Sequence, residues 1–153
     1  MEPKIAHIIK AISDVKSLEL FRIVALTKPN TEILVSKTKL TRKQYYSRMA
    51  SLMNAGLVKR KNGKYTLSAL GKVIYYISVA MIENAVTNYW KLKAIDSLEM
   101  SKDLPAEERK KIIDNFIDNQ DIKAILESDF QSTADTWRQQ QRTYKIKSEI
   151  LVP

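Results

Sequence analysis

The Asn62–Gly63 pair is the feature that most constrains how this chain can fold. It joins two short segments that we expect to be extended, LVKRK at residues 57–61 and KYTL at residues 64–67. Both residues of the pair accept a positive φ, as a two-residue type I′ turn requires, so the sequence predicts a β-hairpin. A lone two-stranded ribbon is marginal in water, and this hairpin must therefore pack against neighbouring helices.

The segment before the hairpin has the start and stop signals of a helix. Thr41 precedes Gln44 by three residues, the reciprocal arrangement in which each side chain accepts a hydrogen bond from the backbone N–H of the other. This capping box predicts a helix that begins at about Arg42. The helix is expected to run to Ala55 and to stop at Gly56, which readily takes the left-handed conformation at a helix end.

This predicted helix has one apolar side. Residues at i, i+4 and i+7 form an inward stripe of Tyr45, Met49 and Leu52. The polar residues of the first two turns are left mainly on the other faces: Arg42, Lys43, Gln44, Tyr46, Ser47 and Arg48. Tyr46 has a second interpretation as a core residue, and Arg48 has one as the partner in a salt bridge that braces the hairpin.

Three elements are predicted ahead of this helix. Apolar residues at helical spacing predict a helix over residues 5–13, and Ser17 is expected to cap a second helix that ends before Pro29. The segment TEILVSK at residues 31–37 predicts a third helix of about two turns, and its β-branched content leaves a strand as the alternative.

Charge is distributed unevenly along the chain. The net charge is +9, but residues 1–80 hold fifteen Lys/Arg and four Asp/Glu, whereas residues 81–153 hold eleven and thirteen. Between Glu32 and Glu83 there are ten Lys/Arg and no acidic residue. Cations on an exposed sheet edge can prevent aggregation, but that explanation accounts for only one or two of them. The acid-free segment therefore indicates a polyanionic partner.

Two segments of the N-terminal half are similar to a known family. DVKSLELFRIVALT, residues 14–27, resembles the second helix of winged-helix repressors of the arsenical-repressor type. LTRKQYYSRMASLMNAGLVKRKNGKYTLSALGK, residues 40–72, resembles their recognition helix and wing. The resemblance covers roughly residues 5–80 and is closest to small archaeal winged-helix regulators. It implies an α+β winged helix, mainly α with a two-stranded β-hairpin wing, which long C-terminal helices would follow.

The resemblance also implies which residues face DNA. Those of the recognition helix, in the major groove, are Thr41, Arg42, Lys43, Gln44, Tyr46, Ser47 and Arg48. Those of the wing, on the backbone, are Lys59, Arg60, Lys61, Asn62 and Lys64. Arg and Lys suit guanine and Gln suits adenine, so Arg42, Lys43, Gln44 and Ser47 are expected to read base edges.

The sequence departs from the family at two places. Thr38 and Lys39 stand where the family often has Leu and Gly, in the turn before the recognition helix. The Cys and His residues of the metal-sensing members are missing, so metal sensing is not implied.

The region after the hairpin predicts one long helix. Ser68 can cap it, and from there to about Glu99 the chain has no Pro and a last Gly at Gly71. Its apolar residues step at threes and fours: Leu70, Ile74, Ile77, Met81, Ala85, Tyr89, Leu92 and Ile95. Such a helix is roughly 45 Å long, at ~1.5 Å per residue. A small winged domain cannot cover that length, so the stripe needs a partner.

We expect this partner to be a second copy of the chain. The predicted homodimer interface consists of Ile74, Ile77, Met81, Ala85, Tyr89 and Leu92. The alternative is packing within the chain, because residues 105–130 supply two further amphipathic segments that could fold back on the same stripe. The two arrangements are compatible with each other.

Several classes of function lack the residues that they need. The chain has no Cys, a single His at His7 and three Gly, so it has no disulfide, no cysteine–metal site and no Gly-rich phosphate loop. Nothing in the sequence brings a serine to His7, and we expect neither enzymatic activity nor a metal or cofactor. No signal peptide is evident, and Glu83, Asn84 and Asn88 interrupt the most apolar stretch. A cytoplasmic, nucleoid-associated protein without membrane insertion is therefore expected.

These observations predict three regions and one main function. Residues 1–71 form the DNA-binding domain, residues 72–130 the long helix and C-terminal helices for dimerisation, and residues 131–153 a polar tail. The expected function is that of a metal-independent, homodimeric transcriptional regulator that binds specific double-stranded DNA sites. The alternatives are a winged-helix protein-interaction module of a transcription or replication assembly, and a chromatin-like protein that binds DNA without sequence preference. No residue pattern requires a small-molecule effector.

Overall fold

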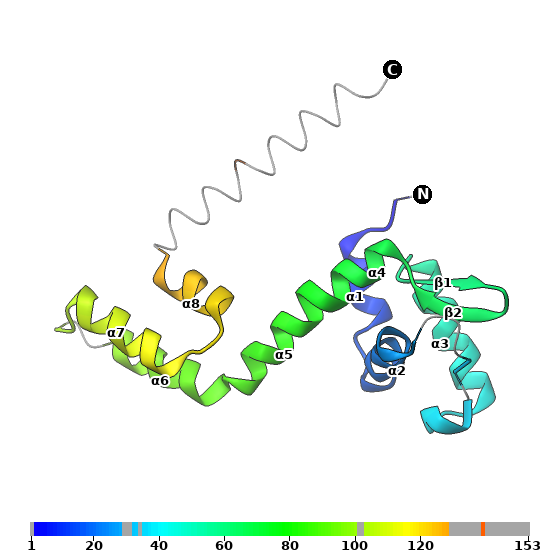
Figure 1. The fold of residues 1–153 in the computed structure, drawn as a ribbon, viewed down its shortest axis with the longest axis horizontal. Helices are drawn as coiled ribbons and strands as arrows, with labels where there is room; N and C mark the ends of the chain where they lie inside the picture. Colours follow the sequence, from blue (N-terminus) through cyan, green and yellow to red (C-terminus); the bar gives the residue numbers. More distant parts are fainter. Residues whose placement is uncertain (1, 29–31, 34, 101–102, 129–138, 140–153) are drawn as a thin grey trace, which may run out of the picture. The chain divides into compact units, whose positions relative to one another are not determined.

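The structure, a computed structural model, describes residues 2–28, 32–33, 35–100, 103–128 and 139. It divides into two compact units, residues 1–82 and residues 83–153. The elements are α1 (Ile5–Ala11), α2 (Val15–Leu26), η1 (Val35–Thr38), α3 (Arg42–Asn54), β1 (Val58–Lys61), β2 (Lys64–Leu67), α4 (Ala69–Val73), η2 (Ile74–Val79), α5 (Ala80–Thr87), α6 (Tyr89–Glu99), α7 (Ala106–Phe116) and α8 (Gln120–Glu127) (Figure 1). The described residues are thus mainly helical with one two-stranded antiparallel sheet, which confirms that part of the predicted fold class.

The first unit has a core to which both helices and hairpin contribute. Its fully buried large side chains are Leu20 and Phe21 of α2, Met49 and Leu52 of α3, and Leu57 before β1. Tyr75 of η2 completes this core, with its ring edge-to-face on Phe21 at 5.6 Å between centroids. The predicted inward stripe of α3 is confirmed, because Tyr45, Met49 and Leu52 are all buried.

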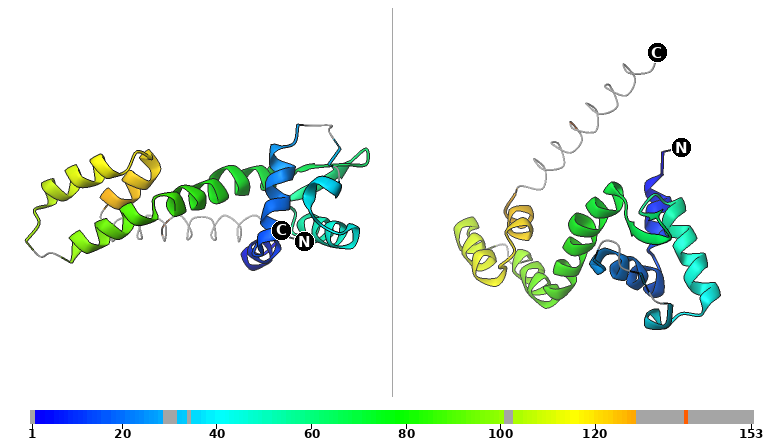
Figure 2. Two further views of the ribbon diagram at one scale, coloured as in Figure 1. Left: turned by 90° about the horizontal axis from the view of Figure 1, so that it is seen from below. Right: turned by 45° about the vertical axis from the view of Figure 1, so that its right-hand side comes forward.

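The predicted β-hairpin is confirmed in place and in turn geometry. β1 and β2 pair from Val58↔Leu67, both buried, to Lys61↔Lys64 at the tip. Asn62 and Gly63 have φ values of 51° and 75°, as a type I′ turn requires. The hairpin therefore inserts its base into the core and projects its tip from the helices (Figure 2).

The ends of α3 also follow the prediction. Thr41 and Gln44 form the reciprocal capping box, and each side chain accepts a backbone N–H of the other at 3.2 Å. At the other end Gly56 takes a φ of 77° and turns the chain into the hairpin. Local signals of this kind depend only on residues three or four apart, which is why they could be read from the sequence.

The segments before α3 differ from the prediction. Asp14, not Ser17, caps α2, because its carboxylate accepts the Ser17 backbone N–H at 3.0 Å. The predicted third helix over residues 31–37 is wrong as stated, since residues 32–33 are not helical and only a 3₁₀ turn, η1, forms at Val35–Thr38. Lys39 follows it with a φ of 55°, a conformation that favours the Gly found there in the resembling family.

The predicted single helix over residues 68–99 is interrupted twice. Residues Ile74–Val79 form π turns, and Asn88, with φ −93° and ψ 14°, separates α5 from α6. Gly71 of α4 and Tyr75 and Val79 of η2 recur every four residues on the buried side. This packing extends the first unit to residue 82, beyond the boundary at residue 71 that the sequence predicted.

The helical stretch Ala69–Thr87 is long and apolar. It has 19 residues. An 18-residue segment of it has a mean hydropathy of 1.2, and 17% of that segment is buried. By length and composition alone it is long enough to cross a membrane, but one such helix is weak support for a membrane span. The same criterion is met by core helices of soluble proteins.

The second unit contains a small helical core. Ile95 of α6, Ile113 of α7, Ile117 after it and Ile122 of α8 are all buried. The two predicted amphipathic segments are confirmed as α7, which begins after Pro105, and α8, which Asn119 caps. The predicted polar tail over residues 131–153 lies outside the described residues, apart from Gln139.

Gly71 tests the packing of α4 against the hairpin. An added Cβ would lie 1.9 Å from the Leu57 carbonyl oxygen, so Gly71→Ala must push two backbone segments apart and should cost about 3 kcal/mol. Gly63→Ala is the control, because it meets open space and only its positive φ opposes it, at about 1 kcal/mol. Urea unfolding of both variants measures the difference, and equal midpoints would contradict the close approach.

Candidate nucleic-acid interface

The outward side of α3 is a polar stripe opposite its buried one. Lys43, Ser47, Ala50 and Asn54 recur at spacings of four, three and four residues, and all are exposed. Tyr46 lies beside this stripe with 51% of its surface exposed, so its interpretation as a core residue is wrong. Ala50 and Asn54 were not among the predicted site residues, although their spacing from the inward stripe could have identified them. The small side chain of Ala50 leaves room for another molecule to approach the helix closely.

One flank of this stripe is a hollow that we call the hairpin groove. It has a volume of about 430 Å³ and lies between the start of α3, the hairpin and the segment around η1. Arg42 of α3 and Arg60 and Lys64 of the hairpin line it together. The structure thus brings three of the predicted cations, from two elements, to one surface. Glu32 lines the same groove and is the acidic group there.

Aromatic side chains hold the hairpin against α3. Tyr45 packs edge-to-face on Tyr65 of β2, with centroids 6.2 Å apart, and on Tyr46, with centroids 5.1 Å apart. The Arg60 guanidinium lies over the Tyr65 ring at 5.5 Å. Edge-to-face and cation–π contacts of this kind orient the groups that they join. The position of Arg60 in the groove is therefore set by a chain of contacts that begins at buried Tyr45.

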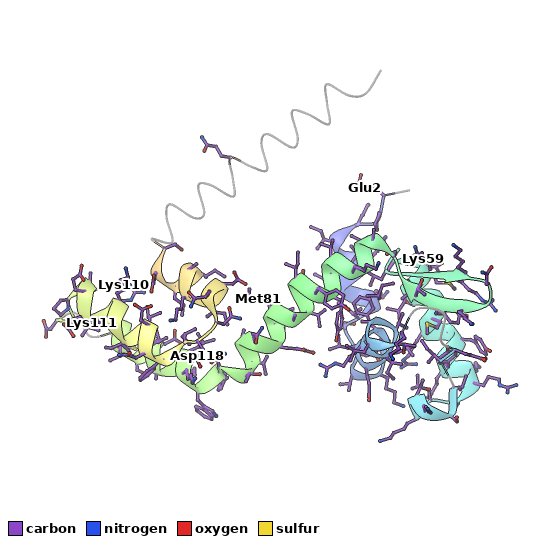
Figure 3. The ribbon with its side chains drawn as sticks, in the orientation of Figure 1. Glu2, Lys59, Met81, Lys110, Lys111 and Asp118 are labelled. Atoms are coloured by element: carbon purple, nitrogen blue, oxygen red, sulfur yellow. The ribbon has the colours of Figure 1, made fainter. Side chains whose placement is uncertain are left out.

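The strand alternation divides the other predicted hairpin cations. Successive residues of a strand point to opposite faces, so Lys59 and Lys61 lie on the face of β1 opposite to Val58 and Arg60. Lys64 pairs with Lys61 and therefore shares its face of the ribbon, although it also lines the hairpin groove at the tip. Lys59 and Lys61 are exposed and do not line the hairpin groove, and Figure 3 labels Lys59 on this strand. Asn62 is exposed and supplies the turn itself. The predicted set of five residues is thus not a single surface.

Gln44 and Thr41 serve the helix start. The Gln44 side-chain oxygen accepts the Thr41 backbone N–H at 3.2 Å, and the residue is half-buried. Bidentate recognition of adenine needs both the oxygen and the nitrogen of a glutamine side chain. Because its side-chain oxygen is used in the capping box, Gln44 stabilises the start of α3 and is not part of the outward stripe.

Arg48 does not brace the hairpin, which was the alternative role considered for it. It is half-buried on the α1 side of α3, and its Nη2 lies 3.4 Å from the Asp14 carboxylate at the start of α2. Hydrogen bonding by Ser17 holds the pKa of Asp14 below its usual value, and Arg48 lowers the pKa further. Arg48 therefore braces the start of α2 and does not contact the hairpin or join the outward stripe.

The predicted dimer residues have mixed surroundings. Ile74 packs in part against the core of the first unit. This packing explains why the residue is apolar, even without a dimer interface. Met81, Ala85 and Leu92 are half-buried, whereas Ile77 and Tyr89 are 65% and 51% exposed. The homodimer interface itself stays a prediction.

Comparison with known proteins adds no assignment. No family model matches the chain, and no curated protein and no solved structure matches it. In the described part of the chain, no group of three or more His, Asp or Glu residues could hold a metal ion.

Tyr45 provides a pH test of the contact between α3 and the hairpin. Burial raises the pKa of Tyr45 from 10 to about 12, and the neighbouring phenols of Tyr65 and Tyr46 add to the effect. Folding then keeps a proton that the unfolded chain loses above pH 10, so stability should fall as pH rises from 10 towards 12. Denaturation of the wild type and of Tyr45→Phe should agree in pH dependence below pH 9 and differ by ~1 kcal/mol at pH 11. Parallel curves up to pH 11 would contradict the burial of this phenol.

Proposed function

We propose that the protein is a winged-helix transcriptional regulator that binds specific sites in double-stranded DNA as a homodimer, without a metal. The observation that carries this proposal is the hairpin groove, where Arg42 of α3 meets Arg60 and Lys64 of the hairpin. In this proposal α3 is the recognition helix and the hairpin is the wing. The resemblance of residues 14–27 and 40–72 to winged-helix repressors supports the same assignment.

The charge and shape of the surface fit a duplex. The major groove of B-DNA admits one α-helix, with a phosphate backbone on each side of it. The outward stripe of α3 has small or flexible side chains that suit this groove, and the hairpin groove beside it supplies cations for one backbone. No acidic residue occurs between Glu32 and Glu83, so α3, the hairpin and α4 contain no carboxylate that repels phosphate, and Glu32 is the carboxylate that lines the hairpin groove.

Base contacts and backbone contacts come from different residues. Lys43 and Ser47 reach base edges from the outward stripe, and Ala50 packs against a thymine methyl group. Arg42, Arg60 and Lys64 neutralise phosphates, with Tyr46 between the two sets. Base contacts set the preference among sites, whereas phosphate contacts set the affinity for every site and its dependence on salt.

The homodimer follows from the geometry of a double site. Two recognition helices about one DNA turn apart bind a pseudo-palindrome and double the number of phosphate contacts. The exposed Ile77 and Tyr89 are candidates for the contact between copies. A chromatin-like mode is the second candidate, favoured by the cations Lys59 and Lys61 on the far face of the hairpin.

The hairpin allows a matched test of backbone binding. Arg60→Ala should weaken binding to all duplexes alike and reduce the slope of log K against log salt by about 1.8, because each copy of the proposed homodimer loses one phosphate contact. Lys59→Ala removes the same charge from the opposite face of the same strand and should leave the slope nearly unchanged. Fluorescence anisotropy with a labelled duplex between 50 and 300 mM salt is the measurement. Equal slopes for the two variants would contradict the role of the hairpin groove.

Lys43 provides the corresponding test of sequence preference. Selection of bound sites at ~0.15 M salt should enrich a two-fold symmetric motif for the wild type, as a dimeric reader of half-sites requires. Lys43→Ala should relax the preference at one position of each half-site and cost about 1–3 kcal/mol there. Featureless enrichment by the wild type would support the chromatin-like mode, and absence of binding would support the protein-interaction module.

A further inference from the structure

The second flank of α3 is a hollow that we call the α1 groove. It has a volume of about 440 Å³ and lies between α1, the start of α2 and α3. His7 and Lys10 of α1 line it, and so do Ser47, Arg48 and Ser51 of α3. Asp14, the cap of α2, is the single carboxylate among the lining residues.

The outward stripe of α3 thus lies between two cation-lined grooves. Ser47 belongs to the stripe and also lines the α1 groove, whereas Arg42 and Tyr46 line the hairpin groove on the other side. Residues 47, 48 and 51 lie on a different side of the helix from residues 42, 45 and 46, as the helical period requires. All these elements belong to the first unit.

The hydrogen-bonding groups of the α1 groove are mostly donors. The Lys10 ammonium and the Ser47 and Ser51 hydroxyls can all donate into it. The Arg48 Nε–H is buried and has no hydrogen-bond partner among the described residues, while its Nη2 is held by Asp14. The charge of Arg48 and Lys10 and the two hydroxyls make the groove a site that favours an anion.

We infer that the α1 groove binds phosphates of the second DNA strand. This inference rests on the proposed function, in which α3 occupies the major groove and one backbone lies in the hairpin groove. The other backbone then runs along the opposite flank of α3, where the α1 groove presents Lys10, Arg48 and the two hydroxyls. The ligand chemistry is a phosphodiester, and its source is the duplex and not a free anion.

Asp14 opposes this binding and so provides a sensitive test. Its carboxylate repels phosphate and holds the Arg48 guanidinium. Asn caps helices as well as Asp does, so Asp14→Asn keeps the start of α2 while it removes the charge and releases Arg48. This substitution should tighten duplex binding. A carboxylate change elsewhere on the same helix should not do so.

The experiment compares two matched pairs of variants of the full chain. Lys10→Ala should weaken binding to a labelled duplex about fivefold and lower the salt slope by about 1.8, one phosphate contact for each copy of the proposed homodimer. Lys16→Ala is its control, because Lys16 is exposed and lines a different hollow on α2. Asp14→Asn should bind at least about twofold tighter, and Glu19→Gln, whose carboxylate lies with Lys16, should bind like the wild type.

The outcomes separate this inference from the proposed function. If Arg60→Ala weakens binding but Lys10→Ala matches Lys16→Ala, the inference is overturned and the proposed function stands. If the wild type shows no salt-dependent duplex binding, both are overturned. Inorganic phosphate at millimolar concentration is the remaining arm. One outcome is that phosphate raises the melting temperature of the wild type but not of Lys10→Ala, while both proteins bind the duplex equally well. In that case the groove is a free-anion site and the inference is wrong.

Discussion

The contact between α3 and the hairpin is the constraint on which the rest of the first unit depends. The base of the hairpin is buried through Leu57, Val58 and Leu67. Nearer the tip, Tyr65 of the hairpin packs against Tyr45 of α3. Without this contact a two-stranded ribbon would not persist in water. With it, Arg60 is held over Tyr65 and faces the start of α3. A core interaction therefore determines where surface charge is placed.

The features predicted correctly from the sequence are those set by near neighbours. The turn at Asn62 and Gly63, the capping box at Thr41 and the buried side of α3 depend on residues a few positions apart. The placement of the cations depends on contacts that no local pattern contains. Arg48 is paired with Asp14, 34 residues away, and strand pairing assigns Lys59 and Arg60 to opposite faces.

The irregular elements were the least predictable part of the fold. The 3₁₀ turn η1 and the π turns of η2 are both shaped by the core that they cover, and their sequences read equally well as ordinary helix. Tyr75 and Val79 of η2 are buried although they lie outside the predicted apolar stripe, whereas Ile77 of that stripe is exposed. Helical period alone therefore assigned the right residues to helix but did not identify Tyr75 and Val79 as the ones that pack against the core of the first unit.

In the proposed function, α3 and the hairpin form one surface for a DNA duplex. Backbone amide chemical shifts of the full chain, followed during titration with a short duplex, test this claim most directly. We expect the shifts to concentrate at Lys43, Ser47 and Ala50 of α3 and at Arg60 and Lys64 of the hairpin, with residues of α7 and α8 unaffected. Shifts confined to residues 83–128, or shifts in α3 without the hairpin, would contradict it.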